Sequence, residues 1–132
     1  NRGVIEIRVY KEGVKADFYI QSHGDKNAGR PLKEPTRNCF AVKTDIPCAY
    51  DIIYVLWKGK MFNNLIIGSV IPFIRLCDIK PVIREYFLKQ YDSKKINAIN
   101  QIANLIEEHN QKVKLLEEYR FVLAVKTVKE AL

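Results

Sequence analysis

A polar stretch at residues 21–37, QSHGDKNAGRPLKEPTR, carries the side chains best suited to binding chemistry. Between Lys26 and Arg37 it holds four basic side chains and a single acidic one, Glu34. Lys and Arg reach phosphates, and Arg and Asn can also hydrogen-bond to the edges of guanine and adenine. We therefore predict a DNA-binding loop whose contacts come from Lys26, Asn27, Arg30, Lys33 and Arg37.

A second polar group lies further along the chain. It comprises Lys58, Lys60, Asn63 and Asn64, together with Ser69 of a Gly-Ser turn, and we predict that these residues also bind DNA. The alternative is that both groups are ordinary solvated loops, since Lys is usually exposed. A long loop without structure of its own is uncommon in a compact domain unless it has a function, which favours the binding interpretation for residues 21–37.

Catalytic chemistry is poorly represented. The two histidines, His23 and His109, have no nucleophile at a suggestive spacing. The phosphate-binding glycine motifs, the nucleophile elbow and the spacing of a metal site do not occur. We therefore expect no enzyme activity, no catalytic residue, no metal and no cofactor. The three cysteines lack CxxC spacing and fit free thiols in a reducing compartment, which predicts a cytoplasmic protein.

The net charge of +7 is unevenly distributed. Residues 1–91 hold 15 basic and 9 acidic side chains, whereas residues 92–132 hold 7 and 6. A basic surface favours a polyanion, most simply nucleic acid, although solubility or chance is the alternative. No apolar run approaches the ~20 residues of a membrane span, and residues 1–20 do not resemble a signal peptide, so no membrane partner is expected.

The patterning predicts an α+β fold, with a small, curved, mostly antiparallel sheet, one packed helix and a long C-terminal helix. Residues 4–10 and 14–20 alternate in polarity around Lys11-Glu12-Gly13, which predicts a β-hairpin, and residues 38–44 supply a third strand. Thr44 or Asp45 can cap a helix over 45–58, with Pro47 in its first turn and Gly59 as its stop. The expected buried residues are Leu56, Trp57, Phe73 and Ile74.

The apolar segment 65–83 precedes the long helix. Residues 65–67 and 70–74 are predicted to be short extended pieces separated by Gly68-Ser69. Residues 76–80 are predicted to form about one helical turn, closed by Pro81 because proline removes a helical hydrogen bond.

The C-terminal part has the pattern of one helix from about Ser93, capped by Asp92 or Ser93. We expect a globular domain over 1–91 and a helix over 92–132. The helix would be about 50 Å long, whereas the globule would be only ~25 Å across. It should therefore project or pair with another helix. The predicted homodimer contacts are Ile106, Asn110, Val113, Leu116 and Leu123. The alternative is a break near His109-Asn110, with the helix folded back.

Residues 45–120 resemble the target-recognition half of a type I restriction–modification specificity subunit, in pattern more than in identity. In that family a short helix of the type xYLxYxL precedes a Gly-Ser turn, an extended segment, a small helical step and a long helix. The corresponding residues here are Tyr50, Ile53, Leu56 and Trp57, then Gly68-Ser69, then Pro72-Phe73-Ile74, and finally Asp78-Ile79-Lys80. Two features depart from the family: the helix entry is IREYFLKQYDSKK, and the chain has one recognition domain and one helix rather than two of each.

The resemblance implies a module that binds duplex DNA, pairs its helix with that of a second copy, and works with methyltransferase and restriction subunits. It also implies that the segment before the long helix crosses the core of the recognition domain. The chain is similar in size and order to small uncharacterised proteins of bacterial mobile elements as well. The competing hypothesis is a protein-interaction module, an adaptor or inhibitor, whose partner surface is the helix.

Overall fold

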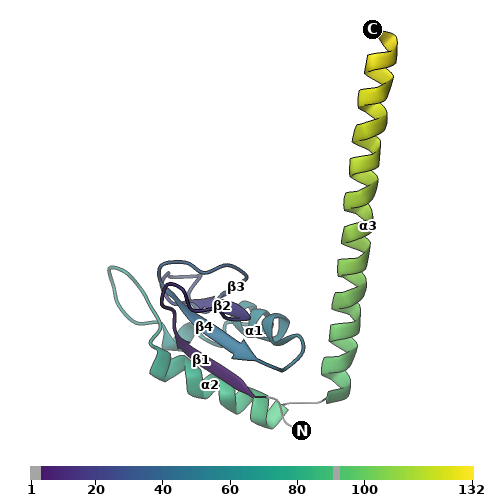
Figure 1. The fold of residues 1–132 in the computed structure, drawn as a ribbon. Coiled ribbons are helices and arrows are strands. Elements are labelled where there is room, and N and C mark those ends of the chain that lie inside the picture. Colours follow the sequence, from purple (N-terminus) through teal and green to yellow (C-terminus); the bar gives the residue numbers. More distant parts are fainter. Residues whose placement is uncertain (1–3, 91–92) are drawn as a thin grey trace. The chain divides into compact units, whose positions relative to one another are not determined.

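The computed structural model describes residues 4–90 and 93–132, so the proposed cap Asp92 lies outside the described residues. The chain divides into two compact units, Asn1–Ser93 and Lys94–Leu132. The elements of the first unit are β1 (Ile5–Val9), β2 (Phe18–Gln21), β3 (Pro31–Leu32), β4 (Cys39–Thr44), α1 (Ala49–Lys58), the 3₁₀ helix η1 (Asn63–Leu65) and α2 (Leu76–Gln90) (Figure 1). Helix α3 (Ser93–Ala131) makes up nearly all of the second unit. The predicted α+β class, with an antiparallel sheet and a long C-terminal helix, is confirmed.

The four strands form an open antiparallel sheet in the order β1-β4-β2-β3. The predicted hairpin between residues 4–10 and 14–20 is therefore wrong, because β4 lies between β1 and β2. The burial pattern explains this order. Strand β4 has four consecutive buried residues, from Cys39 to Val42, so it is apolar on both faces and suits a central position. Strand β1 exposes Glu6 and Arg8 and suits an edge.

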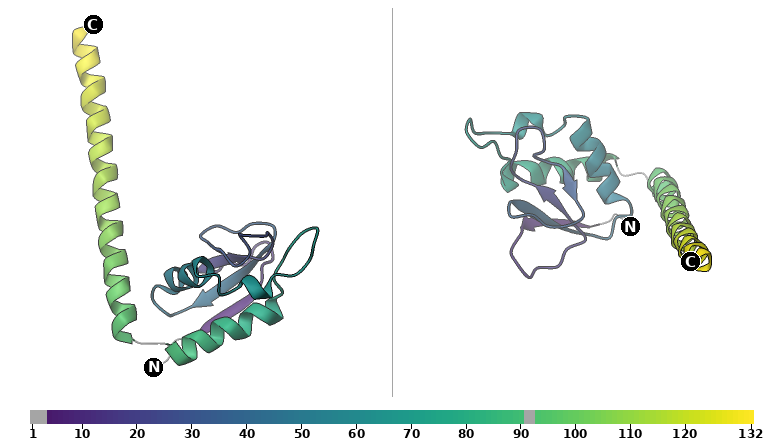
Figure 2. Two further views of the ribbon diagram at one scale, coloured as in Figure 1. Left: turned by 180° about the vertical axis from the view of Figure 1, so that it is seen from behind. Right: turned by 90° about the horizontal axis from the view of Figure 1, so that it is seen from above.

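The main core lies on one face of the sheet. Successive strand side chains point to opposite faces, and one face carries a small cluster of Tyr19, Cys39 and Ala41 without any helical residue. The two helices therefore cover the other face. Helix α2 runs along β1, and α1 contacts β3 (Figures 1 and 2). The fully buried side chains of this core include Ile7, Ile20, Val42, Ile53, Ile79 and Ile83.

Helix α1 begins at Ala49, four residues later than predicted, and ends at Lys58 as predicted. The two expected capping side chains bind the first strand instead. The Asp45 Oδ1 accepts a hydrogen bond from the Val4 amide at 2.7 Å, and the Thr44 hydroxyl donates to the Val4 carbonyl at 2.8 Å. The N-cap residue of α1 is Cys48, whose backbone is in the left-handed conformation.

Helix α2 continues through Pro81 to Gln90, so the prediction of a single turn closed by Pro81 is wrong. A proline inside a helix removes one backbone hydrogen bond. Ile79, Ile83 and Phe87 are buried on both sides of the proline, and their packing offsets that loss. Two helices thus pack on the sheet, whereas the sequence predicted one.

The apolar segment 65–83 lies in the core only in part. Ile74, Ile79 and Ile83 are buried, whereas Val70 and Ile71 are 89% and 65% exposed, so the placement implied by the resemblance fails at the turn that follows Gly68. Leu56 and Ile74 are buried as predicted, whereas Trp57 and Phe73 are only half-buried. Residues 65–67 are only partly extended, since Leu65 ends η1 and Ile67 forms an isolated bridge with Phe73.

Among the glycines that the structure describes, Gly29 leaves the least room for a side chain. Its φ is +93°, and an added Cβ would lie 2.6 Å from Cδ2 of the buried Phe62. Gly13 has a similar φ of +88° but open space around it, so it is a matched control. We expect Gly29→Ala to lower the free energy of unfolding by about 2–4 kcal/mol and Gly13→Ala by about 1–2 kcal/mol, because only the first adds overlap to backbone strain. Urea denaturation of both variants measures this difference, and equal losses would contradict it.

Helix α3 is a single helix of 39 residues, so its axis is about 58 Å long. It continues through His109 and Asn110, so the alternative of a break at this point is wrong. The five predicted dimer contacts, Ile106, Asn110, Val113, Leu116 and Leu123, are all exposed on it.

Candidate nucleic-acid interface

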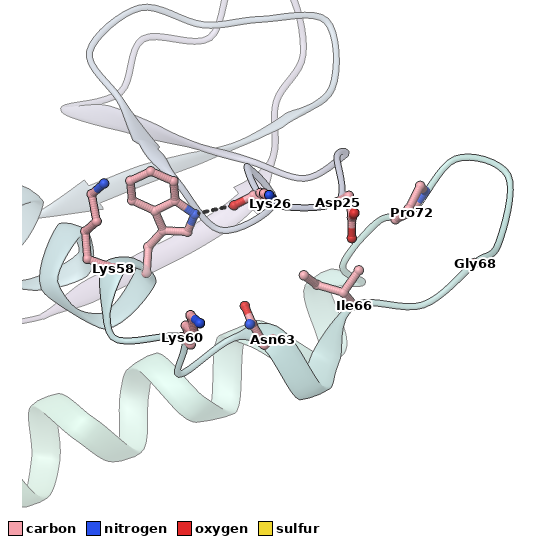
Figure 3. A pocket seen from close by; sticks show the side chains of 9 residues that line it. Asp25, Lys26, Lys58, Lys60, Asn63, Ile66, Gly68 and Pro72 are labelled. Atoms are coloured by element: carbon pink, nitrogen blue, oxygen red, sulfur yellow. Dashed lines mark hydrogen bonds between the residues drawn. The ribbon is translucent and has the colours of Figure 1, made fainter.

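One pocket of about 720 Å³ is lined by three separate segments of the first unit, and two of them supply lysines. The lysines come from the turn after β2 and from the C-terminal end of α1 with the turn that follows it, while the third segment is η1 with the loop between it and α2 (Figure 3). We call it the lysine pocket. It is lined by Asp25, Lys26, Trp57, Lys58, Lys60, Asn63, Ile66, Gly68 and Pro72.

Trp57 connects two walls of the lysine pocket. Its indole Nε1 donates a hydrogen bond to the Lys26 carbonyl at 2.9 Å, so the end of α1 fixes the turn after β2 (Figure 3). The Lys58 ammonium lies 5.0 Å from the centroid of the Trp57 ring and 5.9 Å from that of Tyr54. Cation–π attraction of this kind orients the lysine while leaving its charge exposed.

The end of α1 places Lys60 on the same pocket. Gly59 follows the helix, and its amide donates to the Val55 carbonyl at 2.8 Å. Lys60 then adopts a left-handed backbone conformation with φ of 62°, which turns the chain towards η1. Its own amide donates to the Trp57 carbonyl at 3.0 Å, so this turn is held by the helix it leaves.

The charge of the lysine pocket is predominantly positive. Its three lysines face one acidic side chain, Asp25. The ion pairs recorded among the described residues join Arg8 to Glu6 and Arg75 to Asp78, and neither includes a lysine of the pocket. Lys26, Lys58 and Lys60 are all exposed. Exposed ammonium groups around one hollow attract a polyanion.

The segment 21–37 is held in place by backbone hydrogen bonds and contains strand β3. The Gly29 amide donates to the Gln21 carbonyl at 2.8 Å, and the Ser22 amide donates to the Asn38 carbonyl at 3.1 Å. The Gly24 amide reaches the Pro72 carbonyl at 2.8 Å, which ties the segment to the loop before α2. The expectation of a long loop without structure is therefore wrong.

The five residues predicted in this segment lie in different surroundings. Lys26 lines the lysine pocket, and Asn27, the next residue in the chain, is exposed. The half-buried Arg30 donates from Nη2 to the Gln21 Oε1 at 3.1 Å, so part of its guanidinium binds within the fold. The Lys33 ammonium lies 5.5 Å from the centroid of the Tyr50 ring.

Arg37 lies in a second hollow, of about 300 Å³, with His23, Asn38 and Arg75 among its lining residues. The Arg75 Nε donates to the Asp78 Oδ2 at 2.9 Å, and this hydrogen bond raises the pKa of the Arg75 guanidinium. The carboxylate of Asp78 thus already pairs with one of the two arginines there.

The second predicted group is only partly brought together. Lys58, Lys60 and Asn63 line the lysine pocket, whereas the exposed Asn64 and Ser69 lie next to lining residues in the chain. Sequence reasoning assigned Trp57 to the core and so missed it as a wall of the pocket. The signal available was its position at the end of an apolar helix face, directly before Lys58.

A serine and a histidine also lie close together at the end of β2. The Ser22 Oγ lies 2.8 Å from His23 Nδ1, but Ser22 is buried and the His23 ring stacks on Phe73 with centroids 5.6 Å apart. This pair therefore joins the sheet to the loop before α2.

In the part of the chain that the structure describes, no group of three His, Cys, Asp or Glu side chains could hold a metal. Over the same residues, no helix combines the length and apolarity needed to cross a bilayer.

Comparison with known proteins gives one family. A model with the description "Family of unknown function (DUF6943)" matches residues 7–126. The match takes in most of the globular unit and most of α3, so both belong to the pattern that this family shares. No curated protein and no solved structure matches the chain.

Proposed function

We propose that this chain, which belongs to the DUF6943 family of unknown function, is a non-catalytic module that binds duplex DNA with its lysine pocket and dimerises through α3. The observation that carries the proposal is that Lys26, Lys58 and Lys60 line one pocket that contains a single carboxylate. The resemblance of residues 45–120 to the target-recognition half of a restriction–modification specificity subunit supports the same role.

The residues of the proposed interface have different tasks. The three lysines contact phosphates, which position a protein on the duplex without reading its sequence. Asn63 and its exposed neighbour Asn64 have amide groups that can pair with base edges. Trp57 keeps the two walls of the pocket together through its bond to the Lys26 carbonyl. A second copy, joined through α3, would supply a second pocket and so a second half-site.

The second candidate is a protein-interaction module, an adaptor or inhibitor. It is favoured by the apolar side chains on one side of α3, where Val113, Leu116 and Leu123 are all exposed. Such a face can take a partner helix of another protein as well as that of a second copy. The two candidates differ in the partner of the globular unit, because only the first requires DNA.

Salt dependence of duplex binding tests the proposal. If the three lysines each neutralise one phosphate, the logarithm of the binding constant should fall with the logarithm of salt concentration with a slope of about −2.7 per protomer. Fluorescence anisotropy with a labelled random duplex, read at several salt concentrations, measures this slope. The Lys58→Gln/Lys60→Gln variant should lose about 1.8 of the slope, because two phosphate contacts disappear. Failure of the chain to bind DNA at low salt would refute DNA binding and leave the protein-interaction module.

A further inference from the structure

The loop between Ile67 and Phe73 has a fixed base and an unsupported tip. The two residues exchange both of their backbone hydrogen bonds, each 2.9 Å long. Gly68, with φ of +93°, starts the turn, where an added Cβ would lie 3.1 Å from the Ile71 carbonyl oxygen. Figure 3 shows the chain leaving past Gly68 and returning at Pro72 as an open loop.

The rest of the first unit holds this base from the other side. The Pro72 carbonyl accepts a hydrogen bond from the Gly24 amide at 2.8 Å, and the Phe73 ring stacks on the His23 ring. The next residue, Ile74, is buried, and its amide donates to the Ser22 carbonyl at 2.8 Å. The loop therefore projects from a base that is bonded to the end of β2.

Two aliphatic side chains occupy the tip. Val70 is 89% exposed and Ile71 is 65% exposed, and we call this pair the apolar tip. Water is an unfavourable environment for such side chains. The anchored loop holds Val70 and Ile71 at its end, between the turn at Gly68 and Pro72. The two side chains are therefore in position to enter a partner.

We propose that the apolar tip is a wedge that enters between base pairs of the duplex whose phosphates bind the lysine pocket. The inference rests on the proposed function. The two ends of the loop, Gly68 and Pro72, line the same pocket as the three lysines, so the tip projects from a cationic rim. Minor-groove proteins combine basic side chains with an apolar wedge of one or two residues that partly unstacks a base step and kinks the duplex.

An anionic membrane surface is the competing partner for a basic rim with an apolar tip. The strength of membrane attachment increases with the apolar area buried in the bilayer, and an amphipathic helix or a lipid chain with a basic patch buries a large area. The apolar tip offers only two aliphatic side chains on a short loop. That is enough for one base step but little for a bilayer, so the size of the tip favours DNA.

A wedge changes the shape of the bound DNA more than it changes the affinity of the protein for DNA. The energy gained when the tip enters the stack is largely offset by the cost of unstacking the step. We therefore expect Val70→Thr/Ile71→Thr to weaken duplex binding by about tenfold or less, a change of at most ~1.4 kcal/mol. The same variant should lose the bend in the DNA, because nothing then holds the unstacked step open.

The experiment uses the full chain and a duplex with donor and acceptor dyes at its two ends. Anisotropy reports binding, and energy transfer between the dyes reports bending. The matched control is Val9→Thr/Val14→Thr, which makes the same kind of change at two exposed valines outside the lysine pocket. Vesicles that contain anionic lipid are tested in parallel with wild type and both variants.

The expected result is that wild type and the control bend the duplex, while Val70→Thr/Ile71→Thr binds it without bending. Binding without bending by wild type, or undiminished bending by the tip variant, would refute the wedge and leave the lysine pocket as the DNA site. Vesicle binding that depends on the tip, with DNA bending unchanged, would identify a membrane contact instead. Absence of DNA binding by wild type would refute the proposed function and the wedge with it.

Discussion

Reversing two charges of the lysine pocket, with Lys58→Glu/Lys60→Glu, is expected to lower the affinity for duplex DNA on the order of a hundredfold at low salt, ~2.7 kcal/mol. The variant removes two phosphate contacts and adds two carboxylates to a pocket that already contains Asp25. The repulsion acts over the whole pocket, since the remaining lysine, Lys26, would face three acidic side chains. Anisotropy with the same labelled duplex measures the loss.

The control for this prediction is Lys11→Glu/Lys15→Glu. It changes the net charge by the same amount at two exposed lysines that lie outside the lysine pocket. Substitutions at exposed positions usually change stability by within ~0.5 kcal/mol, and the loss of the cation–π contact of Lys58 costs about 0.5–1 kcal/mol. Thermal unfolding should therefore show folded protein for both variants. Equal losses of DNA affinity in the two would mean that net charge, and not the lysine pocket, governs binding.

Arg37 provides a further comparison within the same measurement. The sequence favoured the segment 21–37 as the interface, so Arg30 and Arg37 were the natural positions for charge reversal. Arg37 lies in the second hollow and does not line the lysine pocket. We therefore expect Arg37→Glu to weaken binding less than Lys58→Glu/Lys60→Glu does. Arg30 is a poor choice for this test, because its side chain hydrogen-bonds to Gln21.

Local patterns in the sequence predicted the elements better than their pairing. Strand β1 follows from alternation, the end of α1 from Gly59, and the unbroken course of α3 from the absence of Gly and Pro after Pro81. The insertion of β4 between β1 and β2 depends on which strand is apolar on both faces. The turn residues Lys11-Glu12-Gly13 favour pairing of β1 with β2. Burial of β4, which is apolar on both faces, in the centre of the sheet outweighs that local preference.

The candidate site was predicted only in part for a similar reason. Its lysines come from segments more than thirty residues apart, and the Trp57–Lys26 hydrogen bond that joins them spans 31 positions. Composition identified Lys26, Lys58, Lys60 and Asn63 but could not show that they share one hollow. The exposure of Val70 and Ile71 was not predicted either, because residues 70–74 were expected only to be an extended piece of an apolar segment.

Helix α3 gives the second large expected effect, the loss of self-association in Leu116→Asp. On a helix, residues three, four or seven apart share a face, so Ile106 and Val113 lie on one side, with Leu116 and Leu123 continuing it. All four are exposed in the chain by itself. Burying a large aliphatic side chain contributes about 1.5–3 kcal/mol, so a second copy that covers this face gains stability from each position.

Asn110 lies on the same face between Ile106 and Val113. A single polar residue at such a position costs some stability but fixes the register and the number of helices that pair. With a two-fold axis, Asn110 of one copy can meet the equivalent residue of the other, and their amides can then satisfy one another. This argues for an ordered pair of helices rather than for indiscriminate apolar association.

The measurement is light scattering on wild type and two variants at equal concentration. Val122→Asp is the matched control, because Val122 is 61% exposed on the same helix but lies about 180° around the axis from Val113 and about 120° from Leu116. We expect wild type and Val122→Asp to be dimers and Leu116→Asp to be a monomer, since a carboxylate buried in an apolar helix pair is strongly unfavourable. A wild-type monomer would refute the dimer. If Val122→Asp dissociates the pair and Leu116→Asp does not, the helices associate through the opposite face.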